Sequence, residues 1–241
     1  GNYKMSYFHK AYFFDAREYT RWFSPDLRWQ YCPGDVYFTP DSPTIVKSRL
    51  LAGDNQNSVI LKLDALRHFM FVNDCAIFRG KIRDSRIRTQ FIKMYINHPL
   101  CDCGVVGHET GIPQEWMVAK KTIREHLEYK FILSLEGNDV ASNLKWVMSS
   151  NSIAVMTRPT CETWFMEGKL IPDYHYIEIK NDFSDFEEKL TYYINHPEKA
   201  QQIIDHAHEY IKQFQNKKRE RLISLLVLDK YFKATGQSGE M

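Results

Sequence analysis

The sequence predicts an α/β protein in which a parallel sheet is covered by helices on both faces. From about residue 75 onward, short apolar runs of strand composition alternate with segments of helical periodicity. Strands separated in this way by helices are typical of right-handed βαβ units. The composition agrees, because 44% of the 241 residues are hydrophobic and 26% are charged, as in average globular domains. Disordered, collagen-like and low-complexity chains are therefore excluded.

The part of the chain before residue 75 is less regular. Residues 1–34 are rich in aromatic side chains without a clean period. We expect a short strand at 36–38 and a helix at 58–69, where apolar residues recur at helical spacing. The change of pattern predicts two parts, a short N-terminal lobe at 1–74 and a larger lobe at 75–241.

The alternating part predicts a definite order of elements. They are strand 75–78, helix 88–96, helix 113–128, strand 131–135, helix 141–149, strand 152–156, strand 175–179 and helix 184–195. Ser184 and Glu187 have the spacing of a capping box, which predicts where the last of these helices starts. Two amphipathic helices, 197–214 and 221–232, complete the chain.

Charge, cysteine content and hydropathy indicate the partners and the cellular compartment to expect. The net charge of +2 gives no overall field toward nucleic acid or anionic membranes, so an anion site must be a local cluster. Five cysteines make an odd, sparse set, which favours free thiols in a reducing compartment. The chain has neither a membrane-spanning apolar run nor the apolar core of a signal peptide at its start. We therefore expect a cytoplasmic protein without a membrane span.

A first candidate site follows the predicted strand 131–135. The strand breaks at Gly137 and Asn138, and the chain then enters a helix. Open α/β sheets bind ligands outside the carboxyl ends of their strands, where a helix N-terminus offers N–H groups to a phosphate. Lys145, one turn inside that helix, could reach the same phosphate. The alternative is that Gly137 only ends the strand and Lys145 is solvated.

A second candidate site follows the predicted strand 75–78. Five cations lie within ten residues there: Arg79, Lys81, Arg83, Arg86 and Arg88. The planar fork of arginine matches phosphate oxygens, so this cluster could neutralise a pyrophosphate. A solvated charged face is the alternative. Because both clusters fall at strand ends of one predicted sheet, their coincidence favours a shared phosphate site.

Other catalytic patterns find little support. His98, Cys101, Cys103 and His108 are close in sequence, but Cys-x-Cys is shorter than the usual spacing of structural zinc sites. The sequence contains no G-x-S-x-G, H-E-x-x-H, Walker or G-x-G-x-x-G motif. We expect no metal ion, and hydrolase, metalloprotease, P-loop and NAD-dependent functions lose their main support.

These residues resemble glycosyltransferase family 90, which includes bacterial lipopolysaccharide glycosyltransferases and the related protein O-glucosyltransferases. The resemblance spans about residues 75–214. Its motifs, in the family's order, are Ile77-Phe78-Arg79-Gly80, Arg88 before a helix that ends near Pro99, Cys101-Asp102, Tyr129-Lys130-Phe131, Gly137-Asn138, Leu144-Lys145, Asn151-Ser152-Ile153-Ala154-Val155, Glu162-Thr163-Trp164-Phe165 and His175-Tyr176-Ile177.

The resemblance implies a B-type glycosyltransferase fold of two Rossmann-like lobes, with a short N-terminal lobe and a C-terminal donor lobe. It implies an inverting, metal-independent transfer from a UDP-sugar to a saccharide acceptor such as the lipopolysaccharide core, with no role for nucleic acid. It leaves peripheral association with the inner membrane open.

The resemblance also assigns residues to the donor site. Arg88 matches the arginine that binds the diphosphate, while Asn143 stands where the family commonly has another arginine. Asp102 and Glu162 are expected near the ribose, because a carboxylate can accept hydrogen bonds from the ribose hydroxyls. The full set expected around the donor is Arg79, Gly80, Lys81, Arg88, Asp102, Gly137, Asn138, Ala141, Ser142, Asn143, Lys145 and Glu162.

The general base is expected at Asp41, because Asp41-Ser42-Pro43 resembles the family's Asp-x-Pro segment. An acceptor hydroxyl must lose its proton as it attacks the anomeric carbon, and a carboxylate can take that proton. A plain turn residue is the alternative for Asp41, and Asp35 is the next candidate base. Two other functions stay open, a non-catalytic nucleotide- or sugar-binding module and a protein O-glycosyltransferase.

Overall fold

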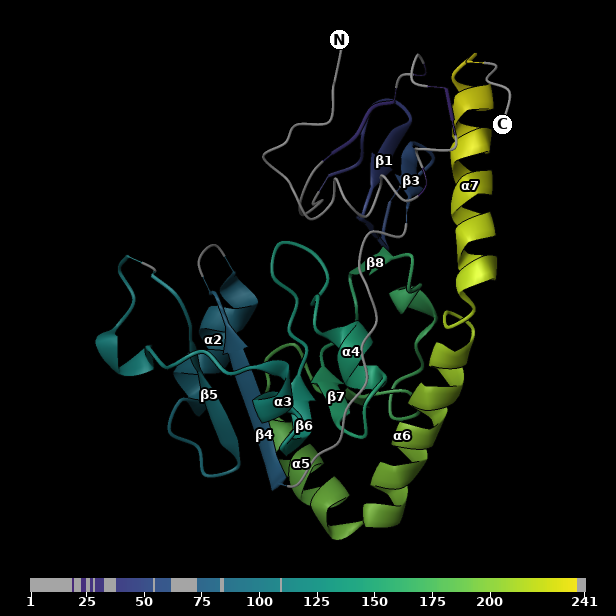
Figure 1. Cartoon of the computed structure of the whole chain (residues 1–241). Helices are drawn as coiled ribbons and strands as arrows, with labels where there is room; N and C mark the ends of the chain where they lie inside the picture. Colours follow the sequence, from purple (N-terminus) through teal and green to yellow (C-terminus); the bar gives the residue numbers. More distant parts are fainter. Residues whose placement is uncertain are drawn as a thin grey trace. The chain divides into compact units, whose positions relative to one another are not determined.

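The structure, a computed structural model, describes most of the chain after residue 37 (Figure 1). The described residues are 19, 23–24, 27, 29–32, 38–53, 55–61, 73–82, 85–108 and 110–237. Contacts divide the chain into two compact units. Unit 1 contains residues 1–65, 160–168 and 213–241, and unit 2 contains residues 66–159 and 169–212. We expected one boundary near residue 74, whereas two later segments group with the N-terminal residues.

Unit 2 is built on a five-stranded sheet whose strand order is β5-β4-β6-β7-β9. Every neighbouring pair in it is parallel. The strands are β4 (Asn73–Gly80), β5 (Cys101–Val105), β6 (Tyr129–Leu133), β7 (Ile153–Met156) and β9 (Ile177–Glu178). The strands that the apolar runs predicted are buried, as parallel strands covered on both faces must be. The predicted α/β class with a parallel sheet is confirmed.

Helices pack around these strands. In chain order, the first three lie between strands of the sheet and the last two follow β9. They are α2 (Arg86–Tyr95), α3 (Ile123–His126), α4 (Leu144–Met148), α5 (Phe186–Asn195) and α6 (Pro197–Lys212). Helix α2 contacts β5, α3 contacts β6, and α4 and α6 contact β7. Phe91 of α2 meets the rings of Phe183 and Phe186 edge to face, at centroid distances of 5.2 and 5.3 Å. These rings lie in a core that includes apolar residues of all five strands.

Two helix predictions in unit 2 are wrong. The segment expected as one helix at 113–128 forms only the short 3-10 turn η2 (Gln114–Trp116) and α3. Between them Val118 donates its N–H to the carbonyl of Val105, so this part of the chain runs beside β5 instead of coiling.

The capping box expected at Ser184 is also absent. Asp185 is the N-cap of α5. Its carboxylate accepts a hydrogen bond from the N–H of Lys180 at 2.8 Å and makes no capping hydrogen bond to the first turn of the helix. A capping box is found instead at Thr122 and Glu125, at the start of α3.

Unit 1 contains short strands and one long helix. Strand β1 (Thr44–Val46) pairs in parallel with β3 (Ser58–Ile60), and β2 (Ser48–Leu50) pairs antiparallel with β8 (Cys161–Thr163). Helix α7 (Lys217–Ala234) contacts β3. Pairing of β8 with β2, and packing of α7 against β3, explain why these later segments belong to the N-terminal unit.

The helix expected at 58–69 is wrong at its start, because residues 58–60 form strand β3. Val59 and Ile60 are β-branched and pair with Ile45 and Val46. Residues 62–70 lie outside the described part of the chain, as do residues 36–37 of the expected strand.

Helix α7 shares a core with those early aromatic residues that the structure describes. Leu228, Tyr231 and Phe232 of α7 are buried in the same cluster as Tyr19 and Ile45. Gln30 donates its backbone N–H to the hydroxyl of Tyr231 at 2.8 Å. The described helices include none that is long and apolar enough to cross a membrane.

Candidate functional site: a cationic cavity at the sheet edge

A cavity of about 240 Å³ lies in unit 2, where β4 and β6 end. Its lining residues come from β4, β6 and the helices near their carboxyl ends: Ile77, Phe78, Arg79, Gly80, Arg88, His126, Ile132, Leu133, Leu135, Ser142, Asn143 and Trp146. Five of these were expected around the donor from the sequence. The cavity has the position at which open α/β sheets bind ligands.

Arg88 is the central cation of this cavity. It lies in the first turn of α2, whose N-cap Ser85 accepts the backbone N–H of Arg88. Its guanidinium donates to the carbonyl of Leu135 from Nε at 3.1 Å and from Nη2 at 2.9 Å. Nη1 donates to the carbonyl of Lys81 at 3.0 Å. Arg88 is thus fixed between the segments that leave β4 and β6, two neighbouring strands.

Gly137 leaves the space that the Arg88 guanidinium occupies. A Cβ added to Gly137 would lie 3.0 Å from Cζ and Nη2 of Arg88. The guanidinium is held by three hydrogen bonds, so it cannot move aside freely. A side chain at position 137 would therefore crowd the guanidinium, which would have to shift by a few tenths of an ångström against these hydrogen bonds.

Arg79 has a partner of its own. Its Nη2 forms an ion pair with Asp102 at 2.5 Å, and its Nη1 donates to the carbonyls of Phe78 and Asp102. Its buried Nε has no hydrogen-bond partner in the part of the chain that the structure describes. Burial alone would raise the pKa of Asp102, but hydrogen bonds from Tyr129 and Arg79 and the Arg79 charge hold it below its ordinary value. Asp102 is thus held as a carboxylate that orients Arg79.

The other residues expected in this region differ in exposure. Ser142 is exposed, and Asn143 donates from Nδ2 to the carbonyl of Leu133 at 2.9 Å. Lys145 is only 1% exposed, inside the five-residue helix α4. Ala141 is buried, whereas Lys81, Arg86 and Asn138 are exposed, and Arg83 lies outside the described residues.

Two aromatic residues of the cavity were not predicted. The rings of His126 and Trp146 meet edge to face at 5.9 Å. Burial lowers the pKa of His126, so the ring is neutral near pH 7. Its Nδ1 lies 2.8 Å from the carbonyl of Thr122 and must carry the proton, which leaves Nε2 as an acceptor. No sequence signal pointed to these residues. The approach of α3 to the cavity depends on tertiary contacts that no local pattern indicates.

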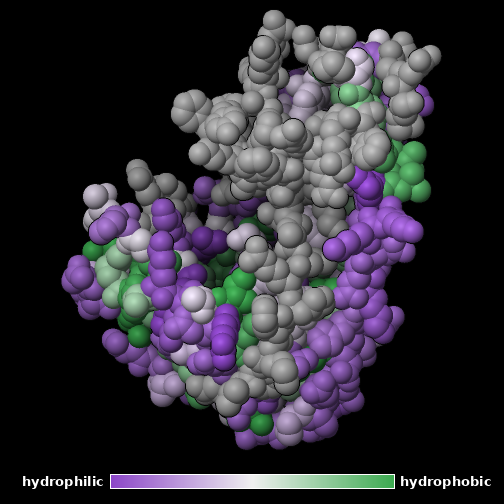
Figure 2. Space-filling model, in the orientation of Figure 1, coloured by the Kyte–Doolittle hydropathy of each residue, from purple (hydrophilic) through white to green (hydrophobic). Residues whose placement is uncertain are grey.

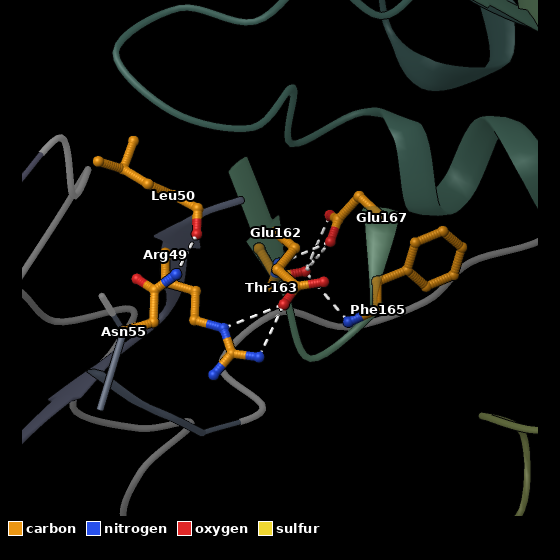
Figure 3. Close-up of polar contacts among 7 residues, drawn as sticks. All are labelled: Arg49, Leu50, Asn55, Glu162, Thr163, Phe165 and Glu167. Atoms are coloured by element: carbon orange, nitrogen blue, oxygen red, sulfur yellow. Dashed lines mark hydrogen bonds and ion pairs between the residues drawn. The ribbon is translucent and has the colours of Figure 1, made fainter. Parts of the chain in front are cut away.

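In unit 1, Glu162 is held by an arginine that the sequence analysis did not single out (Figure 3). Arg49 of β2 and Glu162 of β8 are directly opposite each other. Nε and Nη2 of Arg49 donate to the same oxygen, Oε1, at 3.0 and 2.8 Å. The second oxygen, Oε2, accepts no hydrogen bond from any residue that the structure describes. Arg49 thus engages one oxygen of the Glu162 carboxylate and leaves the other.

The turn after β8 holds this strand end in place (Figure 3). Glu167 is 1% exposed and accepts the N–H of Thr163 at 2.6 Å and its hydroxyl at 2.9 Å. The Thr163 hydroxyl in turn accepts the N–H of Phe165. A Cβ on Gly168 would lie 2.6 Å from Cδ2 of Leu51 and 3.2 Å from Oε2 of Glu162, so the glycine lets the Leu51 side chain and the Glu162 carboxylate pack closely against this turn.

Asp41 lies in unit 1, in the segment that precedes β1. Its side chain is exposed and makes no hydrogen bond or ion pair with the described residues. The backbone around it is fixed, because the Pro40 carbonyl accepts from Asn57 and the Ser42 carbonyl accepts from Thr44. Asp41 is thus an accessible carboxylate on an anchored segment. The other candidate base, Asp35, lies outside the described residues.

Comparison with known proteins defines the class as that of the glycosyltransferases. The sequence model described as glycosyl transferase family 90 matches residues 56–234. The "O-glucosyltransferase LpsA" of Dichelobacter nodosus is 38% identical over 230 residues, which cover 92% of this chain and 72% of that protein. The chain belongs to glycosyltransferase family 90, and it is an enzyme of the glycosyltransferase class.

More distant relatives match a smaller part of this chain. The "Protein O-glucosyltransferase 3" of Homo sapiens is 29% identical over 134 residues, which cover 53% of this chain but 26% of that protein. Sucrose-phosphate synthase from Thermosynechococcus elongatus has a TM-score of 0.47 at 10% identity, with 66% of this chain and 46% of that chain covered. The C-terminal domain of the glycosyl transferase group 1 family protein LpcC from Francisella tularensis has a TM-score of 0.39 at 12% identity, with coverage of 61% and 87%. Both TM-scores lie below 0.5 and carry no further weight.

Proposed function

We propose that the protein is an inverting, metal-independent glycosyltransferase that moves a sugar from a UDP-sugar to a saccharide acceptor in lipopolysaccharide biosynthesis. Family membership supplies the reaction class. The name of the Dichelobacter nodosus relative supports glucose as the sugar and lipopolysaccharide as the pathway. The expected reducing compartment supports a reaction in the cytoplasm.

The observation that carries this proposal is the fixed position of Arg88 against Gly137. A diphosphate leaving group develops negative charge as its bond to the anomeric carbon breaks. A cation already held in place stabilises that charge without reorganising during the reaction. Arg79 lines the same cavity, but Asp102 balances its charge, so Arg88 is the cation proposed to stabilise the leaving diphosphate.

Asp41 is the proposed general base of the reaction. The acceptor oxygen forms a bond to the anomeric carbon and gives its proton to the Asp41 carboxylate. The bond between the anomeric carbon and the diphosphate oxygen breaks, and UDP leaves with the electron pair. Attack from the side opposite the leaving group inverts the configuration of that carbon.

Two alternative functions share part of the proposed chemistry. A non-catalytic module would bind UDP but transfer no sugar. A protein O-glycosyltransferase is favoured by the similarity to the human protein, and it would transfer glucose to a polypeptide hydroxyl. Incubation of the purified chain with UDP-glucose and either a lipopolysaccharide core or a polypeptide acceptor separates the three functions.

Thermal unfolding tests the donor site. UDP should raise the melting temperature in the presence of EDTA, because a ligand that binds only the folded state stabilises it. Arg88→Ala should remove most of that shift. Arg86→Ala, an exposed arginine on the same helix, is the matched control and should keep it. A shift that EDTA abolishes, or that survives in Arg88→Ala, would contradict the proposal.

A further inference from the structure

Helix α7 carries apolar side chains on two opposite faces. Leu228, Tyr231 and Phe232 are buried in the core of unit 1. Leu222, Ile223 and Leu226 point the other way and are 56, 45 and 51% exposed. Residues at these spacings share one side of a helix. Figure 2 shows the resulting hydrophobic patch over α7.

The charges around this patch have one sign. The exposed charged side chains of α7 are all cationic: Lys217, Lys218, Arg219, Lys230 and Lys233. The two acids in the helix pair with two of these cations: the buried Glu220 lies 3.8 Å from Arg219, and Asp229 lies 2.8 Å from Lys233, which leaves Lys217, Lys218 and Lys230 outside these pairs. The chain as a whole has a net charge of only +2, so this concentration is local.

We propose that this face of α7 docks on an anionic membrane surface. We call it the α7 outer face and define it by Leu222, Ile223, Leu226 and the exposed cations around them. Helices that lie in the membrane interface insert an apolar stripe below the headgroups and present Lys and Arg to them. Anionic headgroups attract such cations within a Debye length. A second copy of the chain fits less well, because a two-fold contact would bring like charges together.

The proposed docking goes beyond the proposed function and does not depend on it. Vesicle binding is measured without donor or acceptor, so its failure leaves the transfer reaction untouched. If both hold, the helix would bring the enzyme to the surface where a lipid-linked saccharide acceptor is displayed.

Sedimentation of the full chain with lipid vesicles tests the proposal. We expect binding to phosphatidylcholine vesicles that contain about a third phosphatidylglycerol, weak binding to pure phosphatidylcholine, and a loss of binding near 1 M salt, where the Debye length falls to about 3 Å. Leu226→Ser and Lys218→Glu/Lys230→Glu should each lower the partition coefficient by roughly tenfold or more.

Matched controls change the same residue types elsewhere. Ile171→Ser replaces another exposed aliphatic residue, and Lys199→Glu reverses another exposed helical cation; both should bind like the parent. All substituted side chains are exposed, so melting temperatures should stay near the parent value. If Leu226→Ser unfolds, the double charge variant tests the same claim.

Three results would overturn the proposal. They are equal binding to neutral and anionic vesicles, unchanged binding by both α7 variants, and a dimer that Leu226→Ser converts to a monomer without any vesicle binding. The last result would assign the α7 outer face to self-association.

Discussion

The two units hold the two proposed halves of the chemistry in different ways. In unit 2, Arg88 is locked by three hydrogen bonds to backbone carbonyls beyond the ends of β4 and β6. In unit 1, the Asp41 carboxylate is exposed on the segment that precedes β1 and has no partner among the described residues. Arg88 is fixed beyond the carboxyl ends of two strands, and Asp41 is exposed to solvent.

This difference fits the role proposed for each group. A cation that stabilises a leaving diphosphate works best when it does not move, and sheet ends supply such rigidity. A base must be reached by the acceptor, and binding residues of that kind are commonly carried on surface segments. Donor binding and catalysis should therefore be separable by mutation.

The largest expected effect is that of Asp41→Asn on transfer. The amide keeps the size of the carboxylate but cannot accept the proton, so the transfer rate should fall by roughly 10²- to 10⁴-fold. The UDP-induced shift in melting temperature should not change. Asp205→Asn, at an exposed position on α6, is the control. Transfer at the parent rate by Asp41→Asn would show that the base is another residue.

A second prediction concerns the contact between Gly137 and Arg88. Gly137→Ala should displace the guanidinium and weaken UDP binding by about tenfold, or ~1.4 kcal/mol. Combining it with Arg88→Ala provides the control, since a residue that acts only through Arg88 adds nothing once Arg88 is removed. Isothermal titration of the four proteins measures this coupling. Additive losses would mean that Gly137 serves the site in another way.

A third prediction separates the two carboxylates expected near the ribose. One oxygen of Glu162 has no hydrogen-bond partner among the described residues, whereas both oxygens of Asp102 are engaged, by Arg79 and Tyr129. Glu162→Gln should reduce the preference for UDP over 2′- or 3′-deoxy-UDP several-fold, on the order of 1 kcal/mol for one hydrogen bond. Arg49→Ala should do the same in part, because Arg49 fixes the orientation of the carboxylate.

The result for Asp102→Asn sharpens this prediction. We expect its preference for UDP over the deoxy analogues to match that of the parent. A loss of preference in Asp102→Asn, with none in Glu162→Gln, would reverse the assignment.

The smallest expected effect is on stability in acid. The pKa of Asp102 is lower in the folded than in the unfolded chain, so the unfolded chain binds more protons between the two values. Its contribution to stability is therefore present above the unfolded pKa, about 3.9, and is lost as the pH falls through the folded value. Asp102→Asn should unfold more easily at pH 7 and lose less stability on acidification. Urea titrations at several pH values measure this, and parallel curves for the two proteins would refute it.

The sequence predicted best the elements that a short stretch of neighbouring residues specifies. Strands β4, β6 and β7 are short apolar runs, and Arg88 and Gly137 stand at motif positions beside two of them. Strand β5 was missed, because Asp102 and Gly104 interrupt its Cys-Asp-Cys-Gly-Val segment. The helix expected at 58–69 was wrong at its start, because pairing with β1 outweighs the helical spacing of its apolar residues.

Those parts that depend on distant pairing could not be predicted. Arg49 meets Glu162 only because β2 pairs with β8, more than 100 residues later. The joining of α7 to the N-terminal unit is also long-range, as is the approach of His126 to the cavity. No local periodicity carries such information.

A crystal structure of the protein with UDP tests the central claim most directly. We predict that the diphosphate occupies the cavity beyond β4 and β6, within hydrogen-bond distance of the Arg88 guanidinium and beside Gly137. A diphosphate more than about 6 Å from that guanidinium, beyond reach even through a bridging water, would contradict the account.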